Sequence, residues 1–151
     1  MIDKNKFKNA FAEALVNAGF VKKSNSWYLS GEDAIVVLNL QKSDHGDYYY
    51  LNVGISLKVL SDQPFPKENH CHIQMRADNL VKSEEVHLLC LGMHLEEGGE
   101  ADLSITTRLL KQEILPLTDE FLTLEQLREH YKKSTFKASL IFWKARDLLE
   151  Q

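Results

Sequence analysis

The chain has few of the residues and segments that mark special classes of protein. It contains two cysteines, three prolines and seven glycines among 151 residues, and this near-average composition argues against disorder, collagen and repeat arrays. Its longest apolar runs are far shorter than the ~20 residues that a membrane-spanning helix needs. The first residues contain no apolar segment of a signal peptide. We therefore expect a cytoplasmic protein that has no membrane segment.

The two cysteines give no sign of redox chemistry. Cys71 and Cys90 are each flanked by apolar, strand-like residues. In the cytoplasm such thiols stay reduced. We expect two buried thiols and no disulfide.

Neither sign of charge dominates, and the familiar chemical signatures are missing. The 18 basic residues stand against 22 acidic ones, which gives a net charge of -4 and disfavours a broad nucleic-acid footprint. The sequence contains no glycine-rich phosphate loop, nucleophile elbow or paired-cysteine zinc pattern. We predict no cofactor and no nucleic-acid partner.

Hydrophobic residues are present in the proportion of an ordinary globular domain. They make up 44% of the chain, and a domain of this length buries roughly 70% of the surface that its unfolded chain exposes. We expect a single domain over residues 1–151.

The clearest pattern is an alternation of apolar and polar residues along 48–59. This period of two is that of a half-buried strand. The apolar parity holds Tyr49, Leu51, Val53, Ile55, Leu57 and Val59, and the other holds Tyr48, Tyr50, Asn52, Gly54, Ser56 and Lys58.

The first half of the chain also predicts one helix and two more strands. An apolar stripe at helical spacing predicts a helix from Lys4 to Ala18, which Asp3 caps and Gly19 ends. Turn residues delimit a short strand around 27–29 and a longer one over 34–42, in which Val36, Leu38 and Leu40 face the same way. The prolines in 60–69 predict a loop.

The second half predicts helices and one weakly patterned strand over 85–93. One helix begins at Asp102 and ends near Pro116, and a capping box at Thr123 starts another that runs to Lys132. The basic cluster 128–133, with His130, is expected on the wet side of that helix. A third helix over 136–149 is expected to turn Leu140, Trp143 and Leu148 inward. The predicted fold is α+β, with an antiparallel sheet of about four to five strands and helices packed on one face.

The segment 70–76 supplies the main candidate site. If it is a strand, His70, His72, Gln74 and Arg76 share one face, with Cys71, Ile73 and Met75 on the other. The two imidazoles would then be about 6.6 Å apart at the backbone and could share a metal, although the spacing selects no further ligand. Together with Arg76 they could instead bind a carboxylate or phosphate.

Further polar residues fall on the same predicted face. Asn39 and Gln41 are expected to form hydrogen bonds across it, whereas Lys42 is solvated and Ser43 begins a turn. Asn52, Tyr48 and Tyr50 complete the polar face; the two tyrosines suit a protein interface better than a nucleic-acid stacking platform, because no basic stripe surrounds them.

Several of these segments resemble one bacterial family, catalogued as domain of unknown function 4304. The resemblance implies a bacterial, cytoplasmic protein with an α+β fold, marks Gln41, Lys42, Ser43, His70, His72 and Arg76 for attention, and implies no established reaction. The helix that starts at Thr123 is similar to the later part of the family. The resemblance rests on Gly19–Lys23, Trp27–Tyr28, Asn39–Ser43, Tyr50–Ile55, His70–Ile73 and Arg76.

Two functions follow as hypotheses. The first is a non-catalytic binding module, monomeric or homodimeric, whose polar sheet face recognises a protein partner or a small anionic ligand, as an immunity protein recognises a toxin. The second is a small metal-dependent hydrolase or other enzyme that uses His70 and His72.

Overall fold

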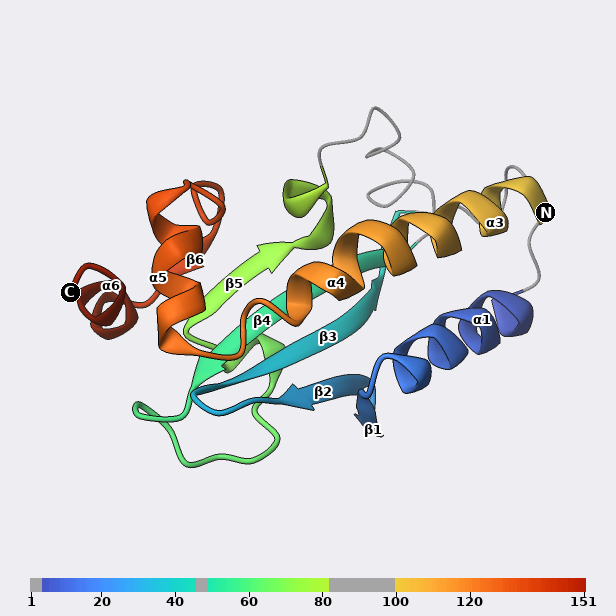
Figure 1. Ribbon diagram of the computed structural model, residues 1–151. Coiled ribbons are helices and arrows are strands. Elements are labelled where there is room, and N and C mark those ends of the chain that lie inside the picture. Colours follow the sequence, from blue (N-terminus) through green and yellow to red (C-terminus); the bar gives the residue numbers. More distant parts are fainter. Residues whose placement is uncertain (1–3, 46–48, 82–99) are drawn as a thin grey trace.

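The computed structural model describes residues 4–45, 49–81 and 100–151. These residues form a six-stranded antiparallel sheet in the order β1-β2-β3-β4-β5-β6, with helices on one face and at one end (Figure 1). The predicted α+β class is confirmed. The sheet exceeds the expected four to five strands because two short edge strands, β1 (Val21–Lys23) and β6 (Leu140–Ile141), extend it.

The centre of the sheet is the hairpin of β3 (Ala34–Lys42) and β4 (Tyr49–Leu57). The two strands pair along their whole length, from Ala34 opposite Leu57 to Lys42 opposite Tyr49. Their predicted alternation is confirmed, because one parity of each strand enters the main core. These core residues are Ala34, Val36, Leu38, Tyr49, Leu51, Val53, Ile55 and Leu57. We call this side the inner face and the opposite side the outer face.

Two helical segments cover the inner face. The first, α1 (Lys4–Asn17), places Phe7 against the Tyr49 ring, with centroids 5.7 Å apart. It ends at Gly19, whose φ of +94° is accessible to glycine and strained for other residues. This helix and its end are as predicted, while Asp3 lies outside the described residues.

The second segment is one continuous helix that crosses the sheet diagonally in Figure 1. It comprises α3 (Glu100–Leu109), the π-helical turn η4 (Leu110–Ile114) and α4 (Leu115–Thr118). The helix ends at Thr118, near Pro116 as predicted, and begins at Glu100, two residues before the predicted start. Pro116 closely follows the π-helical turn and has no N–H to continue the hydrogen-bond ladder, and the helix ends two residues later, at Thr118.

The helix α5 (Leu124–Lys132) begins as the capping-box pattern predicts. The Thr123 hydroxyl oxygen accepts a hydrogen bond from the Gln126 N–H at 3.2 Å. A carboxylate oxygen of Asp33 accepts the Leu124 N–H at 2.8 Å, so the turn before β3 is tied to this helix.

The predicted long helix over 136–149 is wrong. The chain instead forms turns, the short strand β6 and then α6 (Trp143–Leu149). Ile141 pairs with Ile73 of β5 (Ile73–Arg76), and the Phe142 N–H donates a hydrogen bond to the His72 carbonyl at 2.8 Å. Pairing with the sheet edge therefore replaces the helix that the periodicity of this segment predicts. Leu140 and Trp143 point outward rather than inward, whereas Leu148 packs against the core as expected.

The remaining strand is β2 (Ser26–Ser30), which matches the short strand expected around 27–29. The strand expected over 85–93 lies outside the described residues, as does Cys90. Within the described ranges, no helix has both the length and the apolar character needed to span a bilayer.

A candidate binding surface on the outer face

Three candidate residues of the outer face stand in one row across three strands. Asn39 of β3 lies opposite Asn52 of β4, and Asn52 lies opposite Arg76 of β5. The Asn52 amide donates to Gln41 Oε1 at 2.9 Å. The Asn39 amide donates to the Ser26 hydroxyl at 3.3 Å. The expected hydrogen bonding of Asn39 and Gln41 is thus present, and we call this set, Asn39, Gln41, Asn52 and Arg76, the polar row.

Arg76 lies over an aromatic ring. Its guanidinium carbon is 3.7 Å from the centroid of the Tyr50 ring, which is half-buried. Such stacking leaves the edge of the guanidinium able to donate hydrogen bonds. Glu68 is close enough for Arg76 to act on its charge, although burial dominates and raises the pKa of that carboxyl. Tyr48 lies outside the described residues.

The outer face is partly covered by the segment 58–72, a feature that strand periodicity could not predict. This segment runs below the sheet in Figure 1, on the side away from α3 and α4. Phe65 packs edge-to-face on Tyr28 at 5.2 Å. The Gln74 amide holds the segment by donating to the carbonyls of Asn69 and Cys71, at 3.1 and 3.0 Å.

Cys71 belongs to this cover and not to the inner core. It forms a second small cluster with Tyr28, Ile35 and Val37, so the expectation that it shares a face with Ile73 and Met75 is wrong. Burial, with a smaller contribution from Glu68, raises the pKa of the Cys71 thiol to about 12. It is a reduced, buried thiol, as expected, and a poor nucleophile at neutral pH.

The predicted strand over His70 and His72 is also wrong, because β5 begins only at Ile73. His70 ends a short 3₁₀ turn, η1 (Glu68–His70), and is exposed. His72 is buried, and its Nδ1 accepts the Leu57 N–H at 2.9 Å in place of a backbone carbonyl. Burial lowers the pKa of His72, which is neutral with the proton on Nε2.

These positions remove the strand geometry on which the metal pair depended. His72 Nδ1 already accepts a hydrogen bond, and His70 is placed by a turn and not by strand alternation. Among the described residues, no group of three or more His, Cys, Asp or Glu side chains could hold a metal ion. The positions of His70 and His72 therefore give no geometric support to the hypothesis of a metal-dependent hydrolase.

Two grooves flank the cover segment. The first, of about 720 Å³, lies between the polar row and the cover; its lining includes Lys23, Asn39, Gln41, Asn52, Lys67 and Glu68. The second, of about 560 Å³, lies beside β5 and β6; its lining includes His70, His72, Gln74, Leu140, Phe142 and Trp143. Asn69 lines both grooves, so they form adjoining parts of one surface.

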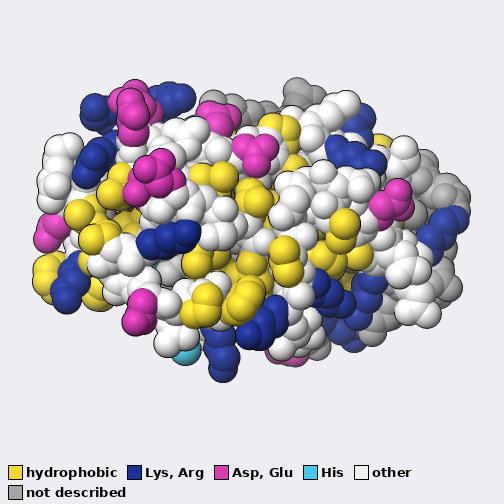
Figure 2. Space-filling view, turned by 60° about the horizontal axis from the view of Figure 1, so that its bottom comes forward, with side chains coloured by type: hydrophobic (Ala, Val, Ile, Leu, Met, Phe, Trp, Pro, Cys, Tyr) yellow, Lys and Arg dark blue, Asp and Glu magenta, His cyan; other side chains and the backbone are white. Residues whose placement is uncertain are grey.

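The second groove has an exposed apolar rim that the sequence analysis missed. The exposed fractions of its side chains are 69% for Leu140, 43% for Phe142 and 61% for Trp143. In Figure 2, apolar side chains are visible at the left-hand end of the molecule, the end where α6 lies in Figure 1, as well as across the middle of this face. The sequence signal was the apolar run 139–143, which we assigned to a buried helix. We call Leu140, Phe142 and Trp143 the apolar rim.

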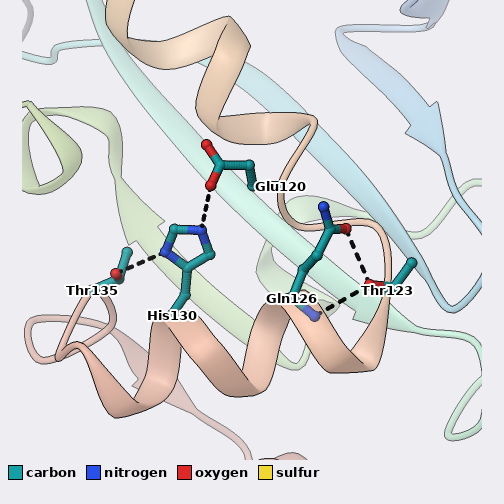
Figure 3. A network of polar contacts seen from close by, with 5 residues as sticks. All are labelled: Glu120, Thr123, Gln126, His130 and Thr135. Atoms are coloured by element: carbon teal, nitrogen blue, oxygen red, sulfur yellow. Dashed lines mark hydrogen bonds and ion pairs between the residues drawn. The ribbon is translucent and has the colours of Figure 1, made fainter.

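His130 contradicts the prediction of a wet helix face. It is buried, and its Nδ1 lies 2.9 Å from the Thr135 hydroxyl while its Nε2 lies 3.2 Å from Glu120 Oε1 (Figure 3). Its ring packs edge-to-face on Phe121 at 5.2 Å. The Thr135 N–H also donates to the His130 carbonyl, so this group joins α5 to its flanking turns. We interpret it as structural, since both ring nitrogens have partners within the fold.

Ser43 and Lys42 occupy the positions expected at the end of β3. The Ser43 hydroxyl accepts the His45 N–H at 3.0 Å and so forms the turn. Lys42 is exposed.

Comparison with known proteins gives a family and no function. The sequence pattern of the family described as Domain of unknown function (DUF4304) matches residues 11–120. The chain belongs to this family. The DUF4304 match contains the polar row and the cover segment, whereas α5 and the apolar rim lie beyond it. No curated protein matches the chain, and no solved structure does.

Proposed function

We propose that this DUF4304 protein is a non-catalytic binding module whose outer face and apolar rim recognise an acidic segment of another protein in the cytoplasm. The role is that of a stoichiometric partner, for which an immunity protein is one example. The surface consists of the polar row, the two grooves beside the cover segment and the apolar rim.

The observation that carries the proposal is the apolar rim. Leu140, Phe142 and Trp143 are three large apolar side chains close together in sequence, and all are exposed. Contiguous exposed apolar side chains rimmed by polar groups mark interaction sites in soluble proteins. Tryptophan, tyrosine and arginine dominate binding energy at protein interfaces, and Trp143, Tyr50 and Arg76 are all on this surface.

The polar part of the surface favours an acidic protein segment. The first groove is lined by two lysines, Lys23 and Lys67, against one carboxyl, Glu68. The amides of Asn39, Gln41 and Asn52 supply both donors and acceptors, which suit peptide groups. An apolar anchor beside such a groove fits a protein chain better than a small anion alone.

The experiment compares two substitutions of equally exposed apolar residues. The tagged protein is used to capture partners from cells that express it naturally, and the retained protein is quantified. Trp143→Ser should reduce capture at least tenfold, because a central anchor contributes about 2 kcal/mol or more. Val16→Ser on α1 is the control, since Val16 is 58% exposed and Trp143 61%.

Two readouts complete the test. Raising the salt concentration should weaken capture by the unsubstituted protein, because the recognised segment is acidic. Equal capture by Trp143→Ser and Val16→Ser, with both proteins folded by circular dichroism, would refute the proposal.

A further inference from the structure

A third groove lies on the other side of the sheet, at the end where α1 leaves the inner face uncovered. It measures about 420 Å³, and α1 and the strands β1 to β4 line it. Its lining is Lys8, Phe11, Ala12, Lys22, Asn25, Trp27, Leu40, Lys42 and Tyr49. This groove shares Asn25 and Leu40 with the first groove, but its lysines are not part of the surface proposed above, and the inference does not rest on that proposal.

The charged residues among the described lining of the groove all carry the same sign. Lys8, Lys22 and Lys42 come from three different elements and line the same space, and none of the described residues that line it is acidic. In Figure 2, lysine and arginine side chains occur at both ends of this face, and one group of them lies to the right of its centre, the side on which α1 lies in Figure 1. The chain as a whole carries a net charge of -4. The three lysines therefore form a local positive site on a protein whose net charge is negative.

The strand register explains why these lysines meet. Lys22 lies opposite Trp27, and Lys42 lies opposite Tyr49. Trp27 and Tyr49 are buried residues of the inner core, so both lysines project on the inner face, just beyond the part that the helix covers. Lys8 reaches the same space from α1.

A rigid aromatic floor positions two of the ammonium groups. The Nζ atoms of Lys8 and Lys22 each lie 5.7 Å from a ring centroid, that of Tyr49 and that of Trp27 respectively. The rings are themselves fixed, Trp27 by Phe11 at 6.5 Å and Tyr49 by the stacked Phe7. Attraction to a ring restricts a lysine without neutralising its charge. The ammonium groups thus remain able to bind an anion.

We propose that this groove binds a small phosphate-bearing anion. The volume falls within the range of small-molecule sites, about 300–1,000 Å³. Lysine binds phosphate as a compact point charge, whereas recognition of a planar carboxylate favours the fork of arginine, and the described lining contains lysine and no arginine. Asn25 is an uncharged polar residue of the same lining.

The test uses the fluorescence of Trp27 as a local reporter. The chain has two tryptophans, so Trp143→Phe leaves Trp27 alone. Sodium pyrophosphate is the probe, titrated at low ionic strength, where screening is weak. We expect a saturable change in emission that added sodium chloride weakens.

Matched triple substitutions then locate the site. Lys8→Gln, Lys22→Gln and Lys42→Gln together should weaken binding at least about tenfold, since a tenfold loss corresponds to only 1.4 kcal/mol shared among the lost charges. The control removes the same charge elsewhere, with Lys111→Gln, Lys132→Gln and Lys144→Gln, all exposed residues, and should change affinity less than about twofold. Lys22→Gln alone should give an intermediate loss, which guards against misfolding of the triple variant.

Two results would overturn the proposal. One is the absence of a saturable change in Trp27 emission with pyrophosphate. The other is an equal loss of affinity in the two triple variants, which would show that pyrophosphate responds to net charge and not to the groove.

Discussion

The two faces of the sheet use the same alternating strands for different purposes. On the inner face, every odd residue of β4 from Tyr49 to Leu57 enters the main core under α1 and the α3–α4 helix. On the outer face, the alternate residues change character along the strand. Tyr50 and Asn52 are half-exposed and polar, whereas Gly54 and Ser56 are buried.

The difference shows how a single strand can serve both folding and recognition. The inner face of β4 is uniformly apolar because helices cover it, while the part of the inner face beyond α1 carries Lys22 and Lys42. The outer face is divided because the cover segment 58–72 packs over Tyr28, Ile35 and Val37 and leaves the polar row open. The candidate binding residues of the polar row therefore lie where the cover segment ends.

The largest effect on stability should come from the inner face. Ile55 is fully buried in the main core. Ile55→Ala should lower the free energy of unfolding by about 3 kcal/mol, because it removes apolar contacts and leaves a cavity. Chemical denaturation measures this loss. A cost below about 1 kcal/mol would mean that the inner face is not the tightly packed side.

The second-largest effect on stability is expected in the part of the outer face that the cover segment covers. A Cβ added at Gly54 would lie 2.7 Å from Cys71 Sγ and 3.2 Å from the Glu68 carbonyl oxygen. Gly54→Ala should therefore cost about 2 kcal/mol by pushing the cover away from the sheet. The control is Gly54→Ala combined with Cys71→Ala, which removes the sulfur and should recover part of the loss in denaturation experiments. A neutral Gly54→Ala would show that the cover does not pack on β4.

His72, at the end of the cover segment, makes the free energy of unfolding depend on pH. Its pKa is lowered from 6.5 by burial, so as the pH falls the unfolded chain takes up the proton first. The contribution of His72 is fully present above pH 6.5 and is lost below it, at up to about 1.4 kcal/mol for each unit of pH. His72→Asn retains an oxygen that can accept the Leu57 N–H and should flatten the fall in stability between pH 7 and 5. An unchanged slope would assign the pH dependence to other groups.

The smallest effect on stability should come from the open part of the outer face. Asn52 is half-exposed, and its hydrogen bond to Gln41 is exposed to water. Asn52→Ala should change the free energy of unfolding by less than about 0.5 kcal/mol. Asn39→Ala is the companion variant. A loss comparable to that of Ile55→Ala would show that the polar row is a structural element.

The sequence predicted the fold best where side chains obey a single period. The strand 34–42, the inner parity of β4, the Gly19 helix end and the Thr123 cap depend on local chemistry, and each is confirmed. The polar row follows from the same parity, so Asn39, Asn52 and Arg76 could be predicted to lie together. Their role in binding stays a prediction.

The failures arise from contacts and turns that the periodicity of the side chains does not encode. His72 replaces a backbone acceptor for Leu57, and Phe142 donates to His72, so two segments with plausible local patterns were redirected by a sheet edge. Cys71 was assigned to the wrong face because the chain curls before β5 begins. His130 looked solvated from its basic neighbours, but Glu120 and Thr135 enclose it. None of these contacts leaves a periodic signal.

The most direct test of the two-face account is a paired measurement on one variant, Arg76→Gln combined with Trp143→Ser. The account predicts that partner capture falls at least tenfold while the free energy of unfolding stays within about 1 kcal/mol of that of the unsubstituted protein. Undiminished capture, or a loss of stability as large as that of Ile55→Ala, would contradict it.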